Sequence, residues 1–335
     1  MKQLDRINRF VNKYLTVFVL LIVAVALVLP GPMSVPGRIS FGTLHLAGRS
    51  FSFSLTNVML MIIMFGAGTA VSPEEIGHLV RRPLTLGIAV IVKYLAMVFA
   101  AFGAARILRL SPELAFGMIL LGSMPSGTAA AVLVALAGGE VPFGVALCVI
   151  STLIAPIASP LLTLLLGGSW VQVDFASMVL NITLIVLIPV VAGILLKLKC
   201  GDRLTNFRRI LTSLSLLSVL LIISNSTAPN RDVILSMESV AVCGAITIMY
   251  VLGVLLCSAA ARLLRMSMPR SYAMIITACE QNSALSVGIA AGLGGSAAVA
   301  IPPIIAVALN FILAAILTNI LAAGNSRPDT NTDQS

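Results

Sequence analysis

The chain has 335 residues, of which 59% are hydrophobic and only 10% are charged. A soluble domain carries roughly 25% charged residues, so this composition excludes an ordinary soluble globule and predicts an all-α polytopic membrane protein in a lipid bilayer. The net charge of +9 does not require a nucleic-acid partner, because the cytoplasmic loops of membrane proteins accumulate Lys and Arg.

Apolar segments of membrane-spanning length recur along the whole chain. About 20 such residues in a helix cross a hydrocarbon core roughly 30 Å thick. The first segment follows the polar start MKQLDRINRFVNK and lacks a small-residue cleavage site, so we expect a retained span and not a signal peptide. In chain order, the ten predicted spans cover residues 15–30, 52–71, 84–108, 114–137, 143–167, 175–196, 210–228, 234–261, 272–294 and 297–323.

The basic residues are distributed unevenly between the loops on the two sides. If the N-terminal segment 1–14 is cytoplasmic, the loops on its side hold 15 of the 21 Lys and Arg residues, and the opposite loops hold five. Such an excess marks the cytoplasmic side. We therefore expect both termini in the cytoplasm and a disordered tail over 324–335. The short loops favour a bacterial inner membrane.

The predicted spans also form two matching sets. Five spans in residues 15–167 correspond in position to five spans in residues 175–323, joined by a linker over 168–174. Because five is an odd number, the second set must cross the membrane in the opposite sense. This is the inverted-repeat plan of many secondary transporters.

Two spans at equivalent positions of the repeats are interrupted. The fourth contains GSMPSGT, in which Pro125 removes a helical hydrogen bond and Gly127 permits unwinding. The ninth contains TACEQNS over residues 277–283. Unwound backbone at membrane depth is tolerated only where protein or a water-filled cavity satisfies it. Matching breaks therefore predict a midplane binding site, and close packing of small residues is the alternative explanation.

Two ionisable residues fall deep inside predicted spans, Lys93 in the third and Glu280 in the ninth. Each is costly there unless it is paired or faces water. Glu280 is a candidate proton carrier, cation ligand or salt-bridge partner. Lys93 is a candidate to neutralise Glu280 or to hold an anion, and the alternative is a side chain that reaches towards the interface.

Three motifs resemble those of the bile acid:sodium symporter family. They are SMPSGTAAAVLVALAGG in the fourth span, EQNSALSVGIAAGL in the ninth and MFGAGTAVSPEEIGHLVRRP after the second, and the resemblance extends over about residues 10–323. It implies ten helices in two domains. Spans three to five and eight to ten would form a core, with the fourth and ninth broken and crossing, and spans one, two, six and seven would form a panel.

The resemblance also implies the substrate, a small or amphipathic organic anion such as a pantoate-like acid, a 2-oxo acid or a bile acid. It would bind between panel and core, beside the crossing. Half-helices that begin there present free N–H groups and a partial positive charge, which suit a carboxylate. We expect Thr128, Ala129 (through its backbone), Asn282 and Ser283 to bind the substrate.

The first sodium site of the family is not matched in this chain. The resemblance implies a Ser–Asn pair after G-T-A, hydroxyls in the fifth span and an acid four residues before the Gln of Q-N-S. Hard cations prefer oxygen ligands, whereas several of these positions hold residues without a suitable oxygen. The corresponding residues are Ala130, Ala131, Gly144, Cys148 and Thr277.

The second sodium site is altered in charge. Gln281 remains, but Lys93 stands where the family has a Gln in the third span, and the acid is Glu280. An ammonium group at that position can replace a bound cation. We hypothesise that Lys93 stands in for sodium and pairs with Glu280 or another polar group of the core.

The sequence thus predicts a secondary active transporter of an organic anion that works by alternating access and is sodium-independent, either proton-linked or uncoupled. The alternative is a sodium symporter with a rearranged site. A membrane-embedded enzyme is a remote alternative, because His45 and His78 lie in predicted loops without catalytic partners. A channel is another alternative, but paired broken helices around one central site favour alternating access. We expect a monomer with no cofactor and, since the five cysteines have no ligand spacing, no metal site.

Overall fold

The computed structural model of the protein describes residues 15–46, 48–71, 83–127, 129–171, 174–293 and 297–325. The predicted N-terminal segment 1–14, Thr128 and residues 326–335 of the predicted tail lie outside these residues. The described part of the chain is helical apart from one two-stranded hairpin.

The elements of the first half, in chain order, are α2 (Leu15–Val28), α3 (Pro30–Ser34), η1 (Pro36–Arg38), β1 (Ser40–Leu46), β2 (Arg49–Ser54), α4 (Leu55–Ala70), α6 (Pro83–Ile107), α7 (Pro112–Gly122), α8 (Ala130–Leu136) and α9 (Val141–Gly167). Those of the second half are α10 (Phe175–Ile182), η2 (Thr183–Leu187), α11 (Ile188–Cys200), η3 (Gly201–Leu204), α12 (Thr205–Thr227), η4 (Ala228–Asn230), α13 (Arg231–Ile234), α14 (Met237–Leu263), α15 (Met268–Cys279), α16 (Ser283–Gly292), η5 (Ala297–Ala300) and α17 (Ile301–Asn325).

Six helices of the described chain are long and apolar enough to cross a membrane by themselves. They coincide with the predicted third, fifth, sixth, seventh, eighth and tenth spans, and their number makes the protein polytopic. Their bounds are Leu84–Ile107, Val141–Gly167, Phe175–Cys200, Asn206–Asn230, Met237–Leu263 and Ala298–Ala323.

The other four predicted spans coincide with shorter or divided helices. The first is α2, which leads into α3 and η1 through a bend of 113°. Pro30 begins α3 directly after this bend, since a proline has no N–H to continue the helix and is tolerated in a first turn. The second is α4, with 16 residues. The fourth is divided into α7 and α8, and the ninth into α15 and α16, as the polar motifs predicted.

The hairpin of β1 and β2 corrects the all-α prediction for residues 40–54. The strands have only seven and six residues, which is too short to form an apolar run of membrane-spanning length. Gly48 in the turn has a φ of 75°, a conformation that glycine adopts without strain. Arg49 donates from Nε to Asp174 Oδ2 at 2.8 Å, which ties the hairpin to the start of α10. This hydrogen bond lowers the pKa of Asp174 and raises that of Arg49.

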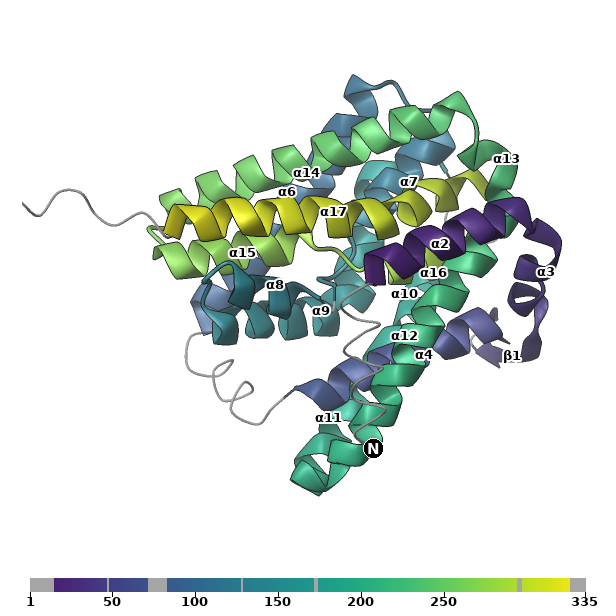
Figure 1. Ribbon diagram of the computed structural model, residues 1–335, viewed down its shortest axis with the longest axis horizontal. Coiled ribbons are helices and arrows are strands. Elements are labelled where there is room, and N and C mark those ends of the chain that lie inside the picture. The colour runs from purple at the N-terminus through teal and green to yellow at the C-terminus, as the bar shows by residue number, and fades with distance from the viewer. Residues whose placement is uncertain are drawn as a thin grey trace, which may run out of the picture.

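The long helices pack in two groups, and α12 of the first group slants steeply relative to α14 and α17 of the second (Figure 1). In the first group α4 packs against α11 and α12, and α12 packs against α2. Helices α4 and α11 touch backbone to backbone, because a Cβ atom on Gly68 would overlap the Val190 carbonyl and one on Gly193 would overlap the Phe65 carbonyl. Small residues at such contacts allow membrane helices to approach closely.

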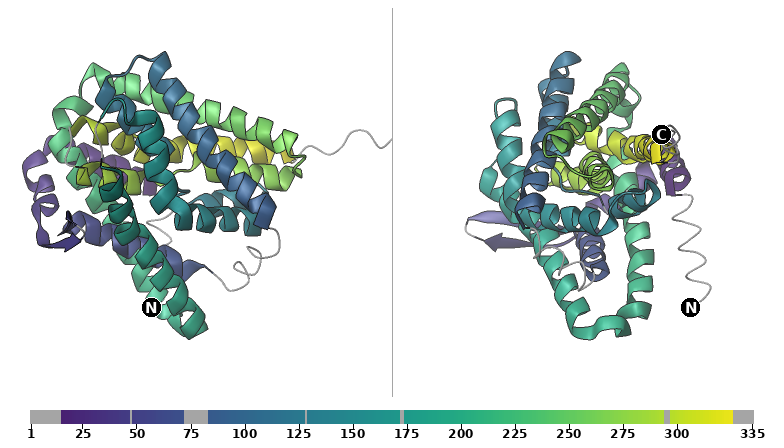
Figure 2. Two further views of the ribbon diagram at one scale, coloured as in Figure 1. Left: turned by 180° about the vertical axis from the view of Figure 1, so that it is seen from behind. Right: turned by 90° about the vertical axis from the view of Figure 1, so that its left-hand side faces the viewer.

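The second group contains α6, α7, α8, α9, α14, α15 and α17, and it encloses an apolar core that runs from Leu86 to Leu317. A second cluster joins the two groups, with Phe116 of α7 and Leu285 of α16 beside Leu60 of α4 and Ile222 of α12. The hairpin formed by α11 and α12 projects beyond the second group (Figure 2). The divided helices therefore lie where the two groups meet.

The close contact between α4 and α11 predicts that alanine in place of a glycine there destabilises the protein, whereas alanine in place of a glycine without close neighbours does not. Gly68→Ala forces the backbones apart and should lower the free energy of unfolding by about 1–3 kcal/mol. Gly87→Ala in α6 is the control, because nothing lies within 4 Å of its Cβ position, and alanine there should stabilise the helix by up to about 1 kcal/mol. Thermal unfolding in detergent measures both. A Gly68→Ala protein that unfolds at or above the wild-type temperature would contradict this packing.

Candidate functional site

The two helix breaks lie against each other in the structure. The segment between α7 and α8 and the segment between α15 and α16 form an antiparallel bridge in which Ser126 is opposite Gln281. Gly127 N donates to Glu280 O at 2.7 Å, and Asn282 N donates to Pro125 O at 2.9 Å. Each break thus satisfies backbone groups of the other, as unwound chain inside a membrane requires.

Small residues of the first break allow close approach, Gly122 to α6 and Gly127 to the second break. A Cβ atom on Gly122 would lie 2.8 Å from Ala101 Cβ and 2.9 Å from Met97 O. A Cβ atom on Gly127 would lie 3.2 Å from Gln281 O. Pro125 has no N–H to leave unpaired. The motif GSMPSGT therefore ends α7 and brings its backbone to the second break.

Side chains reinforce the bridge between the two breaks. Ser126 Oγ donates to Thr277 O at 2.7 Å. Gln281 Nε2 donates to Gly122 O at 2.9 Å, while its Oε1 has no hydrogen-bond partner among the described residues. The Thr277 hydroxyl donates to Ala273 O of its own helix at 2.7 Å. Thr277 and Gln281 are both buried at the crossing, and the side chain of each already donates a hydrogen bond to a backbone carbonyl.

Two side chains hold the start of the second half-helix, one as an N-cap and one through a hydrogen bond to α17. Asn282 Oδ1 accepts from Leu285 N at 3.0 Å, which is an N-cap of α16. Ser283 Oγ accepts from Asn310 Nδ2 of α17 at 2.9 Å. In the other break, Ala129 precedes α8 without a side-chain cap, and Thr128 lies outside the described residues. Asn282 and Ser283 therefore hold the half-helix in place, whatever else they bind.

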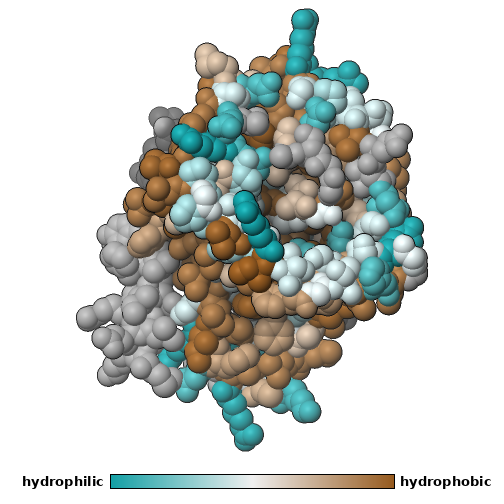
Figure 3. Space-filling model, turned by 90° about the vertical axis from the view of Figure 1, so that its right-hand side faces the viewer, coloured by the Kyte–Doolittle hydropathy of each residue, from teal (hydrophilic) through white to brown (hydrophobic). Residues whose placement is uncertain are grey.

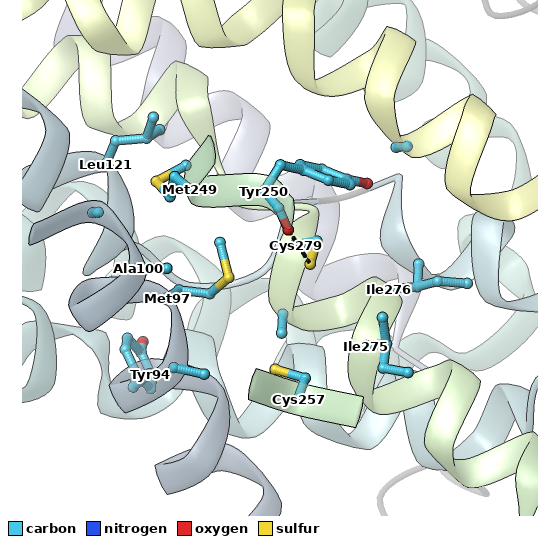
Figure 4. Packing of buried hydrophobic residues seen from close by; sticks show 14 of the residues in the cluster. Tyr94, Met97, Ala100, Leu121, Met249, Tyr250, Cys257, Ile275, Ile276 and Cys279 are labelled. Atoms are coloured by element: carbon cyan, nitrogen blue, oxygen red, sulfur yellow. Dashed lines mark hydrogen bonds between the residues drawn. The ribbon is translucent and has the colours of Figure 1, made fainter. Parts of the chain in front are cut away.

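Lys93 is 1% exposed in the middle of α6, and its Nζ atom has no hydrogen-bond partner in the described chain. The ammonium lies 4.8 Å from the centre of the Tyr94 ring, and the Tyr94 hydroxyl donates to Ser151 O of α9 at 2.7 Å. Apolar and sulfur-containing side chains of α6, α14 and α15, among them Met97 and Cys257, pack in this region (Figure 4).

Glu280 follows the last residue of α15 and is 4% exposed, and its Oε2 atom likewise has no hydrogen-bond partner within the described residues. No ion pair joins Glu280 to Lys93, so the direct pairing of the two is not formed in this structure. The Cys148 side chain of α9 lies near enough to interact electrostatically with both. The ammonium of Lys93 and one carboxylate oxygen of Glu280 are thus buried without hydrogen-bond partners among the described residues.

An unpaired charge in a protein interior costs several kcal/mol, and in a membrane such residues mark the paths of ions or substrates. The uncompensated ammonium, carboxylate oxygen and Gln281 Oε1 all belong to the crossing or to the helices around it. The arrangement can therefore bind polar or charged species. Groups of three or more His, Cys, Asp or Glu suited to a metal ion are not found among the described residues.

Comparison with known proteins agrees with this geometry. Residues 57–237, more than half of the chain, match the model of the Sodium Bile acid symporter family. The chain belongs to the sodium bile acid symporter family. It is thereby a multi-pass membrane protein of a transporter family, and the family points to transport and not to an enzyme.

Relatives of this family member occur in bacteria and plants. "Uncharacterized sodium-dependent transporter YocS" of Bacillus subtilis is 34% identical over 237 residues, which cover 71% of this chain and 74% of YocS. "Probable sodium/metabolite cotransporter BASS1, chloroplastic" of Arabidopsis thaliana is 28% identical over 265 residues, or 79% of this chain and 66% of that protein. The rice protein of the BASS2 type is 34% identical over 141 residues, 42% of this chain and 34% of its own length.

The sequence did not predict some of the residues that stabilise the crossing. Ser126 joins the breaks through its hydroxyl, and its N–H donates to Ser151 Oγ of α9 at 3.3 Å. The hydroxyls of Ser123 and Thr163 share a hydrogen bond of 2.6 Å that fixes the end of α7 to α9. Ser123 and Ser126 could have been predicted from the motif GSMPSG, because each places a hydroxyl next to a helix-breaking residue. Thr163 has no local signal, because its partner is 40 residues away.

The N-cap at Asn282 predicts a graded loss of stability. Asn282→Ala removes the side-chain acceptor for Leu285 N and should lower the free energy of unfolding by about 1 kcal/mol. Asn282→Ser keeps a capping oxygen and should retain most of it. Denaturant or thermal unfolding of the purified variants checks this order. Equal stability of the wild type and the Asn282→Ala variant would show that the cap contributes nothing.

Proposed function

We propose that this protein is a secondary active transporter that carries a small or amphipathic organic anion across the bacterial inner membrane by alternating access. The observation that carries the proposal is the antiparallel contact of two helix breaks, Ser126 against Gln281, with unpaired ionisable side chains beside it. Discontinuous helices that meet in this way form the substrate and ion sites of many secondary transporters.

The proposed architecture has ten crossings in two inverted repeats, residues 15–167 and 175–323, with a linker over 168–174. The exchange of Gly127 N with Glu280 O and of Asn282 N with Pro125 O supports it, because such a pair of bonds relates the two breaks by a local two-fold axis. The grouping of α2, α4, α11 and α12 apart from the other long helices supports a panel and a core.

Contacts between loops support the same topology. Alternate crossings from a cytoplasmic N-terminus put Arg49 and Asp174 on the outer side, and their ion pair spans 2.8 Å. They put Glu140 and Arg270 on the inner side, where the Arg270 Nε to Glu140 Oε2 distance is 2.7 Å. The hydrogen bond from Arg270 to Glu140 raises the pKa of Arg270. Both ion pairs thus join loops of one side, as the proposal with both termini in the cytoplasm requires.

The proposed substrate site lies at the starts of the half-helices α8 and α16. Thr128, the backbone at Ala129, Asn282 and Ser283 would offer donors to a carboxylate, helped by the positive end of the α16 dipole. The substrate class is an organic anion of the pantoate-like, 2-oxo acid or bile-acid-like kind. The cap at Asn282 uses the side-chain oxygen, which would leave the amide nitrogen to face the anion.

We propose that transport is sodium-independent, with Lys93 in the place of a sodium ion. Two contacts support the loss of the first ion site. The Thr277 hydroxyl donates to Ala273 O, and Val134 packs at 3.2 Å from the Cβ position of Gly144. The unpaired Lys93 ammonium lies in the same region as Gln281 and Glu280, so its own charge would supply what a bound cation supplies elsewhere in the family.

The second candidate is sodium symport through a rearranged site. The names of the relatives favour it, since YocS is called sodium-dependent and the chloroplast proteins are called sodium/metabolite cotransporters. Gln281 Oε1 and Glu280 Oε2 would then be ligands, because both oxygens lack hydrogen-bond partners among the described residues.

Uptake into proteoliposomes with and without a sodium gradient separates the two candidates. With Lys93 as the fixed cation, wild-type uptake of pantoate should be insensitive to sodium. Lys93→Met keeps the length of the side chain without its charge and should reduce uptake at least about tenfold, a loss of about 1.4 kcal/mol. Lys199→Gln, at the end of α11, is the control for an ordinary loss of positive charge. Strong sodium stimulation that survives Lys93→Ala would contradict the proposal.

If a carboxylate binds at the start of α16, a negative charge at residue 282 should slow anion uptake without lowering the stability of the fold. Asn282→Asp keeps a capping oxygen but repels an anion at the start of α16. The purified variant should unfold near the wild-type temperature and take up the anion at least about tenfold more slowly. Unchanged uptake by Asn282→Asp would remove Asn282 from the proposed site, and the Asn282→Ser protein controls for the altered amide.

A further inference from the structure

A separate cavity lies where α3 and η1 fold over the end of α12. Its volume is about 410 Å³, within the range of about 300–1,000 Å³ that is typical of small-molecule sites. The face of the molecule on that side is hollowed near its centre, with both hydrophilic and hydrophobic side chains around the hollow (Figure 3). No residue of either helix break lines the cavity. It is lined by Pro30, Gly31, Ser34, Gly37, Arg38, Asn225, Ala228 and Pro229.

One wall of this cavity holds an amide without partners. Asn225 is 7% exposed, and neither its Nδ2 nor its Oδ1 is hydrogen-bonded to a described residue. The same turn of chain contains two more unpaired buried oxygens, Thr227 Oγ1 and Asn230 Oδ1. A buried polar group left without a partner costs about 1–3 kcal/mol. A ligand with both a donor and an acceptor would remove this cost at Asn225.

The cover over Asn225 is thin. A Cβ atom on Gly37 of η1 would lie 3.5 Å from Asn225 Cβ, so η1 covers the amide side chain with a glycine that has no side chain of its own. Nothing lies within 4 Å of the Cβ position of Gly31, which borders open space. A small displacement of η1, which carries no buried side chain, would bring the amide to a ligand in the cavity.

The cavity favours an anion over a cation. Arg38 is exposed and lines it, and a guanidinium offers five donors in a planar fork that matches carboxylate and phosphate oxygens. The nearby C-terminal end of α12 carries a partial negative charge of about one half. Arg38 brings a full positive charge to the lining, and none of the lining residues carries a negative charge, so the cavity suits an oxyanion.

We propose that this cavity binds an oxyanion that carries a neighbouring hydroxyl group, with Arg38 on the oxyanion and the Asn225 amide on the hydroxyl. The amide is suited to a hydroxyl because both groups donate and accept. Two sources have this chemistry, a soluble 2-hydroxy acid and the phosphoglycerol headgroup of an anionic lipid. The site is distinct from the crossing, and the proposal does not depend on transport.

Binding to the full-length protein in phosphatidylcholine nanodiscs tests the site, with radiolabelled glycerol 3-phosphate and pantoate as probes in equilibrium dialysis. Because pantoate is also the proposed transport substrate, only the part of its binding that Ala228→Trp removes is counted for this cavity. Arg38→Gln should weaken binding at least about tenfold, the loss of one charge-assisted contact. Ala228→Trp fills the cavity and should abolish binding there. Asn225→Leu removes the amide at similar size and should weaken binding while the protein stays folded. Arg231→Gln is the control, because this neighbouring arginine does not line the cavity.

Adding phosphatidylglycerol to the nanodiscs separates the two sources. If the lipid headgroup is the natural ligand, it should suppress probe binding to the wild type, and the residual binding should no longer differ from that of Arg38→Gln. If a soluble acid is the ligand, pantoate should bind equally in both membranes. Lys93→Met, which should stop transport, should leave the binding of glycerol 3-phosphate unchanged. Identical isotherms for the wild type, Arg38→Gln and Ala228→Trp, with no effect of the lipid, would overturn the proposal.

Discussion

The structure depends on two hydrogen bonds between helix breaks. A membrane interior offers no water to an unwound backbone, so a break in α7–α8 or α15–α16 is stable only if something else satisfies it. Here each break satisfies the other, through Gly127 with Glu280 and Asn282 with Pro125. The packing of Gly122 against Met97 and the hydroxyl contacts of Ser126 follow from the need to bring the two segments together.

The same crossing explains why charge is kept inside this protein. Lys93 and Glu280 are buried without hydrogen-bond partners for Lys93 Nζ and Glu280 Oε2 in the described chain, a state that stability alone does not favour. A transporter must bind its substrate and let it go, so an interior whose polar groups await partners suits this task. A fixed ammonium in the place of a bound cation would keep an anion site attractive in the absence of an ion gradient.

Much of this arrangement is readable from the sequence, because its signals are local. Pro125 and Gly127 predict the first break and the run EQNS predicts the second. Six of the ten predicted spans coincide with described helices long enough to cross a membrane. The relation between segments is not local. The lack of an ion pair between Lys93 and Glu280, the cap that occupies Asn282 and the bond from Ser123 to Thr163 all depend on how distant helices pack. The hairpin at 40–54 escaped because its strands are short.

We propose that one site at the crossing opens to each side of the membrane in turn. Substrate counterflow in proteoliposomes tests it most directly. Vesicles are loaded with unlabelled pantoate and diluted into a trace of labelled pantoate. A carrier predicts that the label accumulates transiently above its equilibrium level, because each outward trip of unlabelled anion returns the site to collect a labelled one. A steady approach to equilibrium without an overshoot, as a pore would give, would contradict the account.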